Sequence, residues 1–546
     1  MLVQKIQQNN NIQQHPQFKG AVDTTLRYLA TNQGVGANLT DVGFMVLPRM
    51  ATDAQRGPDA FMETTRREAS GTCNHSAVGL YGAAGGGLTA AAMGMKKNFG
   101  VRANKIFAAP ETLNILAENK ANQVKNNESQ VDYLKETLKN LKAFNPNAAN
   151  ADKDGYVKLS ESTIDEIASM LDKSIDNLDY NTWEKKTTIN SKHTAMNKII
   201  ADTGAESKFI LETPDAKIKS ETKLETLLDD IYKVSDAFNS KEVKKAFEEQ
   251  VQNGKGIKDN AFIKKFTKFA KIKSATGFAV ATGIGMSIQP MNIYLTKKKT
   301  GSDGFVGVEG RSKDKSTEFK LMKTAAAAGF LGLTLATLGT ASPKKFMEKM
   351  AFKGFMPTLS QLKGIYGLTI ISRLFATRDK DELRESLTKD LLGFVSWLIL
   401  GDVVNKFVAE GLDKSVMNRT KDVDSKGLFN RVFHSTLKTR DEVLVETLSK
   451  NGIATVKEDG VAKTFKEMIK DLDKIADEQV KKLAKKRLRT LNWAQAAGYA
   501  FSGLVLGLGI PNLNIYITNA LDKKRKAKAL EVEMNTQEKP SITQAA

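Results

Sequence analysis

Four stretches of the chain contain no charged residue and are as long as a membrane-spanning helix. A bilayer core needs about 20 predominantly apolar residues in helical conformation. The charge-free stretches are 76–95, 274–296, 324–343 and 490–521. Two further segments, 354–372 and 391–412, fit short or tilted spans, or interfacial helices. The pattern predicts a helical protein that crosses a membrane roughly four to six times.

The segments between these stretches have the pattern of soluble amphipathic helices. Apolar residues recur every three or four positions among Glu and Lys, as in Ile164, Ile167 and Leu171. This is the spacing of one buried helix face. Alternating strand patterns are scarce. The predicted fold class is therefore mainly α, a polytopic helical membrane protein with soluble helical insertions.

These patterns divide the chain into consecutive segments. They are 1–74, an N-terminal polar arm with an amphipathic region; 75–97, the first span; 98–261, a soluble helical domain; 262–412, membrane helices with basic flanks; 413–489, a soluble helical segment; 490–521, the last span; and 522–546, a basic and then polar tail. The polar start lacks the apolar core of a secretory signal. We therefore expect a membrane location without a cleavable signal peptide.

Small residues four positions apart recur in the predicted spans. They are Gly82 and Gly86, Ala281 and Gly285, and Gly503 and Gly507. In lipid, such pairs let helix backbones approach closely, within one chain or between chains of a homo-oligomer. In a soluble helix interior each glycine would cost about 1 kcal/mol relative to alanine. The pattern favours packed membrane helices over the alternative, a Gly-rich soluble core.

Two distant segments indicate an internal repeat. Each starts with Gly and an aromatic residue, at 277 and 498, and has a proline thirteen positions later, Pro290 and Pro511. The runs NIYLT (292–296) and NIYIT (514–518) follow. Secondary transporters often carry repeats with a Pro-interrupted helix beside the site, so we interpret the prolines as kinks. The alternative is two similar hairpin ends with a structural proline. Three spans between the copies would make them parallel, and two would make them antiparallel.

The formal charge of +20, from 82 basic and 62 acidic residues, is concentrated at the two copies. Residues 262–299 contribute +8 and residues 481–528 contribute +10. In the first region Phe262, Phe266 and Phe269 share a helix face among lysines, as in a helix that lies in the headgroup region. The predicted membrane-surface residues are Lys264, Lys265, Lys268, Lys271, Lys273, Lys481, Lys482, Lys485, Lys486, Arg487 and Arg489. Each basic residue near anionic lipid contributes about 1 kcal/mol.

Nucleic acid is the alternative partner for this charge. The chain lacks a recognisable helix-turn-helix, RRM or zinc-finger pattern, and its lysines flank apolar spans. We therefore expect the lipid bilayer, with its anionic lipids, as the partner.

The strongest local motif resembles an EF-hand calcium loop. Its predicted oxygen ligands are Asn150, Asp152, Asp154, Tyr156 (through its carbonyl) and Glu161, with Gly155 at the sharp turn. Three features depart from that pattern: Asn at the first position, Lys158 at the ninth, and Pro146 in the entering helix. The loop also has no second copy. It predicts weak calcium binding, and the alternative is an Asp/Gly turn capped by Ser160 or Ser162.

Enzymatic chemistry has little support in the sequence. The single cysteine, Cys73, lies two positions from His75, which places the two on opposite sides of a helix. The other histidines are scattered, and there is no phosphate-binding Gly-rich motif. We expect a protein that is not an enzyme and needs no cofactor besides calcium.

Three segments resemble uncharacterised bacterial membrane proteins. They are FKGAVDTTLRYL (18–29), RGPDAFMETTRREASGTCNHS (56–76) and SRLFATRDKDELRESLTKDLLGF (372–394). The resemblance implies a bacterial membrane protein and no particular activity. The expected function is therefore a non-enzymatic integral membrane protein, either a scaffold or transporter-like. The alternatives are a membrane-inserting phage or secreted protein, such as a pore former or effector, and a basic nucleic-acid-binding protein.

Overall fold

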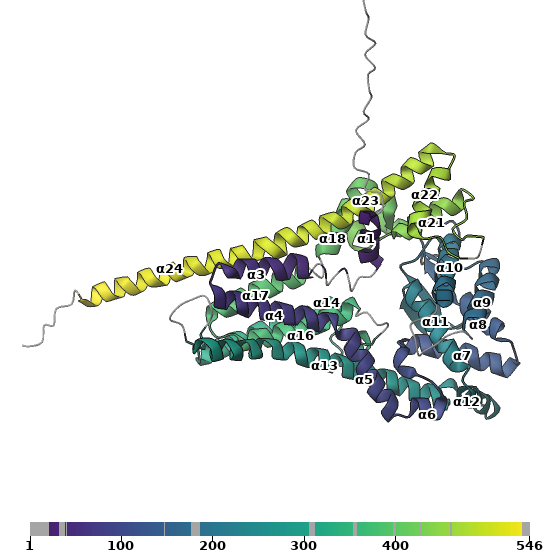
Figure 1. Ribbon diagram of the computed structural model, residues 1–546, viewed down its shortest axis with the longest axis horizontal. Coiled ribbons are helices and arrows are strands. Elements are labelled where there is room, and N and C mark those ends of the chain that lie inside the picture. The colour runs from purple at the N-terminus through teal and green to yellow at the C-terminus, as the bar shows by residue number, and fades with distance from the viewer. Residues whose placement is uncertain are drawn as a thin grey trace, which may run out of the picture.

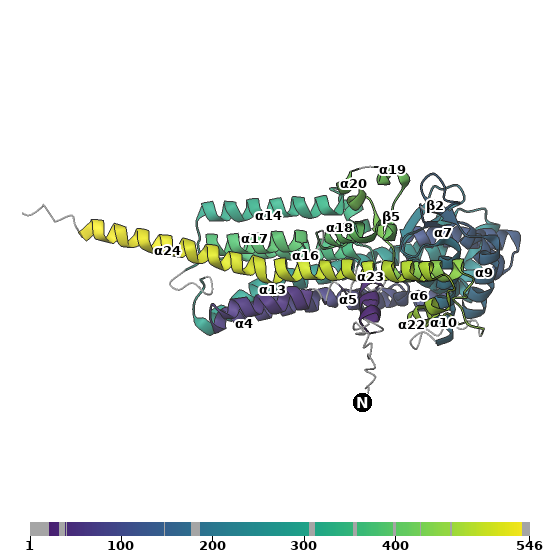
Figure 2. The same cartoon turned by 90° about the horizontal axis from the view of Figure 1, so that it is seen from above.

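Long helices form an elongated bundle at one end of the molecule, and shorter helices with two small sheets form the other end (Figures 1 and 2). The computed structural model describes residues 21–31, 36, 39, 41–146, 148–175, 186–304, 312–352, 358–396, 400–425, 427–458 and 461–537. The first part of the predicted N-terminal arm and the end of the predicted tail lie outside these residues. The described chain is mainly α-helical, as predicted.

The bundle is built from helices that are far apart in the sequence. Its elements are η1 (Val42–Val46), α3 (Leu47–Ala54), α4 (Pro58–Ser76), α5 (Val78–Ala92), α13 (Ala261–Thr300), α14 (Thr317–Leu338), α15 (Pro343–Lys349), α16 (Leu359–Ala376), α17 (Lys380–Val395), α18 (Gly401–Asp413), α23 (Glu478–Ser502), η7 (Gly503–Gly509) and α24 (Ile510–Gln537). α23, η7 and α24 follow one another without a break and form the longest rod in Figure 1. The short α1 (Ala21–Thr31) lies against α23.

Two insertions form the other end. The first contains α6 (Met95–Phe99), η2 (Ala103–Lys105), α7 (Pro110–Asn126), α8 (Gln130–Lys139), β1 (Leu141–Phe144), β2 (Tyr156–Lys158), α9 (Glu161–Ile175), α10 (Lys186–Thr203), β3 (Phe209–Glu212), β4 (Lys219–Thr222), α11 (Leu224–Phe238), α12 (Lys241–Gln252) and η3 (Ile257–Asp259). The second contains η5 (Lys414–Val416), β5 (Met417–Asn418), α19 (Lys421–Asp424), α20 (Leu428–Phe433), β6 (Thr436–Leu437), α21 (Arg440–Lys450), α22 (Phe465–Asp471) and η6 (Leu472–Lys474).

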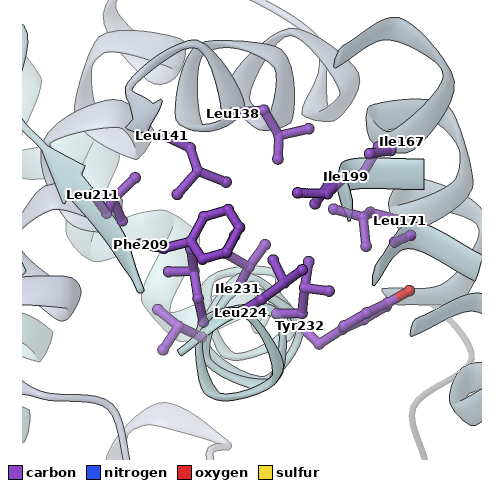
Figure 3. Close-up of a cluster of buried hydrophobic side chains, with 14 of the residues drawn as sticks. Leu138, Leu141, Ile167, Leu171, Ile199, Phe209, Leu211, Leu224, Ile231 and Tyr232 are labelled. Atoms are coloured by element: carbon purple, nitrogen blue, oxygen red, sulfur yellow. The ribbon is translucent and has the colours of Figure 1, made fainter. Parts of the chain in front are cut away.

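The largest hydrophobic core lies in the first insertion and extends into the second (Figure 3). Apolar faces of α8, α9, α10 and α11 close over an antiparallel sheet of order β2-β1-β3-β4, in which Ala143 pairs with Val157 and with Phe209. Reciprocal capping boxes fix several helix starts, such as Ser129 with Asp132 at α8. The four short strands are an addition to the predicted all-helical insertion.

The start of α13 belongs to this core. Phe262, Phe266 and Phe269 are at most 1% exposed, and the Phe262 ring lies 5.3 Å from that of Phe99. The interpretation of this face as one that lies in lipid headgroups is therefore wrong. The periodicity located an apolar face, but that face is covered by protein.

Two helices in the described part of the chain are long and apolar enough to cross a membrane: α14 and the continuous helix Glu478–Glu531. α14 contains residues 324–338 of the charge-free stretch 324–343, and the helix Glu478–Glu531 contains the whole stretch 490–521. The stretch 76–95 is divided between the end of α4 and the 15-residue α5. That helix is about 22 Å long, shorter than a bilayer core. Composition and length thus support two of the predicted four to six spans.

The repeat copies run parallel. Both begin beside the insertions and extend to the opposite end of the bundle, and three long helical segments, α14, α16 and α17–α18, lie between them (Figures 1 and 2). Parallel copies are the arrangement expected when three helical segments lie between them. Pro290 lies inside the uninterrupted α13, whereas Pro511 follows a π-helical segment, η7. The two proline positions are therefore not structurally equivalent.

Candidate functional site

Charged side chains fill the interior of the bundle. Ten of them are less than 9% exposed. They come from α4, the segment before it, α16, α17 and the connection between α16 and α17, and they are Asp41, Arg49, Glu63, Glu68, Arg373, Arg378, Asp381, Glu382, Glu385 and Asp390. A buried ion that lacks a partner costs several kcal/mol. The geometry of their pairing therefore decides whether this interior is stable.

At the centre, two arginines form matching ion pairs. Arg49 Nη1 lies 3.1 Å from Glu68 Oε2, and Arg373 Nη1 lies 3.1 Å from Asp390 Oδ1. Each guanidinium reaches a glycine on the opposite side. A Cβ at Gly393 would lie 3.2 Å from Arg49 Nη2, and a Cβ at Gly71 would lie 3.8 Å from Arg373 Nη2. The absence of a side chain thus leaves room for each arginine.

The next layer contains two ion pairs that cross between segments. Arg56 donates two hydrogen bonds to Glu385, at 2.8 and 2.7 Å. Arg378 donates to Glu63 at 2.7 Å and also to Glu382 at 2.9 Å. Such bidentate guanidinium–carboxylate pairs are among the strongest hydrogen-bonded contacts in proteins.

Towards the end away from the insertions, the long helices repeat the same contacts. Thr296 on α13 accepts a hydrogen bond from Arg66 Nη2 at 2.9 Å, and Thr518 on α24 accepts one from Arg384 Nη2 at 2.5 Å. Beyond them, Lys299 pairs with Asp59 at 2.8 Å. Arg525 pairs with Asp381 at 2.6 Å. The NIYLT and NIYIT runs therefore present their threonines to the same kind of partner.

A wider similarity in the sequence accompanies these paired contacts. Segment 56–71 reads RGPDAFMETTRREASG and segment 378–393 reads RDKDELRESLTKDLLG. At a constant separation of 322 (378 − 56, 385 − 63, 393 − 71) they share an Arg, an Asp, a Glu and a Gly. The comparison of these two segments would have revealed the larger repeat.

Each repeat consists of a first helix, a second helix, an insertion and a long third helix. Repeat 1 uses η1–α3, α4–α5 and α13; repeat 2 uses α16, α17–α18 and α23–α24. Arg56 of repeat 1 binds Glu385 of repeat 2, and the equivalent Arg378 of repeat 2 binds Glu63 of repeat 1. Reciprocal contacts of this kind define an isologous, twofold interface. The ionic network therefore lies on a pseudo-twofold axis between the repeats.

A cavity of about 10 Å³ opens inside this network. It is lined by Arg67, Gln289, Arg373, Ser386, Lys389 and Asp390. Arg67 and Lys389 are equivalent positions of the two repeats (389 − 67 = 322). Gln289 Oε1, Arg373 Nε and Asp390 Oδ2 have no hydrogen-bond partner among the described residues. The space admits one water-sized group.

The EF-hand-like motif lies at the hairpin between β1 and β2. Asp152 Oδ1 accepts the backbone N–H groups of Asp154, at 3.0 Å, and Tyr156, at 2.8 Å, and Gly155 has a φ of +83°. A cavity of about 380 Å³ there is lined by Asn150, Asp152, Tyr156, Lys158, Leu159, Ser160 and Asp202. Three of the five predicted ligands thus share one cavity.

The other two predicted ligands, Asp154 and Glu161, do not line this cavity. Asp202 was missed because α10 brings it from far along the chain, where its Oδ2 accepts the Ser160 N–H at 2.8 Å. Among the residues that the structure describes, no three His, Cys, Asp or Glu side chains are grouped closely enough to hold a metal ion. Ser160 Oγ accepts the Thr163 N–H at 3.4 Å, which matches the capped-turn alternative. Calcium binding stays a prediction.

The predicted membrane-surface residues differ in exposure. Exposed ones are Lys264, Lys268, Lys271, Lys482, Lys486 and Arg489, and half-buried ones are Lys265, Lys481, Lys485 and Arg487. Lys273 was assigned wrongly, since it is 2% exposed. Its Nζ donates to the carbonyl oxygens of Asn104 and Ile106, at 3.2 and 3.0 Å, and lies 3.3 Å from the Phe107 ring centroid. Lys273 therefore fastens α13 to the first insertion.

The described residues form a mainly α protein whose helix bundle holds a network of buried ion pairs. Comparisons with protein families, curated proteins and solved structures give no match.

Proposed function

We propose that the chain is an integral membrane protein whose duplicated bundle lies in a bilayer and acts in a transporter-like way, with the ionic network between the repeats as its working site. The observation that carries this proposal is the inverted distribution of polarity in the bundle. Charges lie inside, and large apolar side chains lie outside.

The apolar exterior covers several bundle helices. Exposed side chains include Leu80, Leu88, Val280, Ile284, Met286, Met291, Tyr294, Leu321, Met322, Leu331, Leu504, Leu508, Leu513 and Tyr516. Soluble monomers seldom expose contiguous apolar patches above about 600 Å², and they seldom bury charges fully. In membrane proteins ionisable groups instead face the bundle interior. A bilayer therefore accounts for both halves of the pattern.

Exposed residues on the third helix of repeat 2 show how far this apolar surface extends along the bundle. Trp493 is 65% exposed and Tyr516 is 72% exposed, and apolar exposed residues lie between them. Twenty-three residues of helix span about 34 Å, close to the hydrocarbon thickness of about 30 Å. Trp and Tyr are enriched at the two membrane interfaces. We name the exposed surface between Trp493 and Tyr516 the apolar band.

Burial distinguishes the two candidate spans from core helices of a soluble protein. Only 22% of the most apolar window of α14 is buried, and 33% of that of the helix Glu478–Glu531. A soluble core helix would be mostly buried. The exposure of these helices supports contact with lipid.

A transporter-like role is favoured over a scaffold by the place of the charges. Parallel repeats related by an axis along the membrane normal occur in transporters, which bind substrates at the repeat interface. The network and its cavity lie at that interface. A purely structural bundle has no need of these groups, because apolar packing of the same volume is often equally stable or more so.

Alkaline carbonate extraction of membranes from an expression host tests the membrane location. We expect the protein to stay in the pellet and to be released only by detergent. Leu504→Lys with Leu508→Lys, in the apolar band, should reduce the pellet fraction severalfold. Leu483→Lys, on the same helix but outside the band, is the matched control. Release of the wild-type protein without detergent would refute the proposal.

The same assay distinguishes a resident membrane protein from the alternative, a secreted or phage protein that inserts into membranes. Such a protein would first be recovered in soluble form and would resist carbonate only after incubation with vesicles. A resident membrane protein is in the pellet from the start.

A further inference from the structure

The short helix α20 presents an apolar surface outside the bundle. Phe429 is 70% exposed, Phe433 is 53% exposed and Leu428 is 43% exposed. Val432, in the same short helix, is fully buried. Val432 thus anchors the helix in the second insertion, while three large apolar side chains of the same helix are exposed to solvent.

Contacts place this surface at one edge of the apolar band. The Phe429 ring packs on the Phe407 ring of α18, with centroids 5.8 Å apart. α18 runs alongside α23: a Cβ at Gly498 would lie 3.1 Å from the Gly401 carbonyl, and Arg487 donates to Ser415 at 2.9 Å.

These two contacts set the level of α20 along the bundle. Gly401 lies beside Gly498, and Ser415 lies beside Arg487, so the two helices run in opposite directions. Phe407, between 401 and 415, therefore lies near the level of Trp493, between 498 and 487. Trp493 is the exposed residue that begins the apolar band. In Figure 2, α20 and the end of α14 nearest to the insertions lie at the same level along the long axis of the bundle.

In the helix that follows the second helix of repeat 1, the large apolar residues are buried instead. There the second helix is followed by α6, whose Met95 and Phe99 are 0% and 8% exposed because the large first insertion covers them. In repeat 2 the smaller insertion leaves Phe429 and Phe433 uncovered. The exposed surface is therefore specific to repeat 2.

We propose that α20 is a lateral membrane anchor whose Leu428, Phe429 and Phe433 insert at the boundary between headgroups and acyl chains, beside the bundle. The inference rests on the proposed membrane location and names a further lipid contact. Exposed apolar side chains of a short helix suit the boundary between headgroups and acyl chains.

A second protein fits this surface less well. A stable protein interface buries about 800 Å² on each partner. Three side chains on a six-residue helix supply far less than that. An interfacial lipid contact has no such minimum, and it is continuous with the apolar band.

Lipid-dependent quenching of tryptophan tests the proposal in the full-length protein. The three native tryptophans are replaced by Phe, and single tryptophans are placed at 493 (the native residue restored), at 429 (Phe429→Trp) and at 483 (Leu483→Trp). The proteins are reconstituted in vesicles of phosphatidylcholine and phosphatidylglycerol with and without brominated acyl chains. Phe433→Trp serves as a second reporter on α20.

We expect brominated lipid to quench Trp493 and Phe429→Trp to within about twofold of each other, and Leu483→Trp only weakly. Quenching of Trp493 without quenching at 429 and 433 would overturn the anchor and leave the proposed membrane location intact. Absence of quenching at all positions would overturn both. Equal quenching of Leu483→Trp would mean that the contact is not specific to α20, which also overturns the proposal.

Discussion

The reciprocal ion pairs between the repeats permit a quantitative test of the duplication. Single and double substitutions, Arg378→Gln with Glu63→Gln and Arg56→Gln with Glu385→Gln, define two double-mutant cycles. Because the pairs are equivalent under the pseudo-twofold axis, the two coupling energies should be similar. The cycle isolates each pairwise contact from the other effects of the substitutions.

The expected size follows from burial and hydrogen bonding. Arg378 and Glu63 are 2% and 6% exposed, and Arg56 and Glu385 are 11% and 10% exposed. Removal of one partner from a buried pair typically costs about 3–5 kcal/mol. When Glu63 is replaced, Arg378 still pairs with Glu382 at 2.9 Å, so the loss of stability is smaller. We therefore expect coupling energies of about 1.5–3 kcal/mol for both pairs.

The assay is unfolding of the detergent-solubilised protein by SDS, followed by far-UV circular dichroism. Lys299 with Asp59 is the matched control, since this pair has a similar distance, 2.8 Å, but is 60% and 42% exposed. Exposed pairs contribute about 0.2–1 kcal/mol. A coupling energy at Arg56–Glu385 no larger than that of the control, while Arg378–Glu63 couples strongly, would refute the equivalence of the repeats.

Three further predictions use the same protein. Burial, with the nearby Asp441 and Glu442 carboxylates, raises the pKa of Glu206 to about 8. Because this exceeds the unfolded value of about 4.3, the stabilisation is present below about pH 4.3 and is lost progressively as the pH rises to about 8. Glu206→Gln should therefore flatten the fall in unfolding free energy between about pH 5 and 8. In the SDS assay the Gly71→Ala protein should be more stable than the Gly393→Ala protein. A Cβ at 393 would lie 3.2 Å from Arg49 Nη2 and crowd it, whereas a Cβ at 71 would lie 3.8 Å from Arg373 Nη2, an ordinary contact distance. Glu161→Gln should abolish the heat of calcium binding in titration calorimetry, and an unchanged titration would remove the calcium prediction.

The sequence predicts apolar faces well and their partners poorly. The spacing of Phe262, Phe266 and Phe269 correctly indicates one apolar helix face, yet a headgroup region and a protein core require the same spacing. Lys273 lies a few residues further along and reads as one more flanking lysine. Only the packing of α13 on the first insertion shows that it is buried. Periodicity shows that a helix has an apolar face, but it does not show whether protein or lipid covers that face.

The ionic site was missed for a different reason. Single charges such as Glu63 or Arg378 are unremarkable in a helix with many charges, and their burial depends on contacts between residues more than 300 positions apart. A detectable signal nevertheless existed, the shared Arg, Asp, Glu and Gly of segments 56–71 and 378–393. Comparison of the chain with itself would have placed both arginines at equivalent positions. The Arg–Glu pairing would still have needed the structure.

The reciprocal pairs also bear on how the proposed transporter-like activity would work. If either repeat were alone in a bilayer, its Arg and Glu side chains would face lipid, where a charge at the helix centre costs about 2.5–3.5 kcal/mol or more. Each repeat thus supplies the polar surroundings that the other needs.

A movement that separates the two repeats would break both Arg56–Glu385 and Arg378–Glu63, because each pair joins repeat 1 to repeat 2. Their summed coupling energy, about 3–6 kcal/mol from the values expected above, then sets the scale of the barrier. A barrier of that size permits thermally driven exchange between two arrangements, whereas an apolar interface of the same area would provide no discrete contacts to exchange.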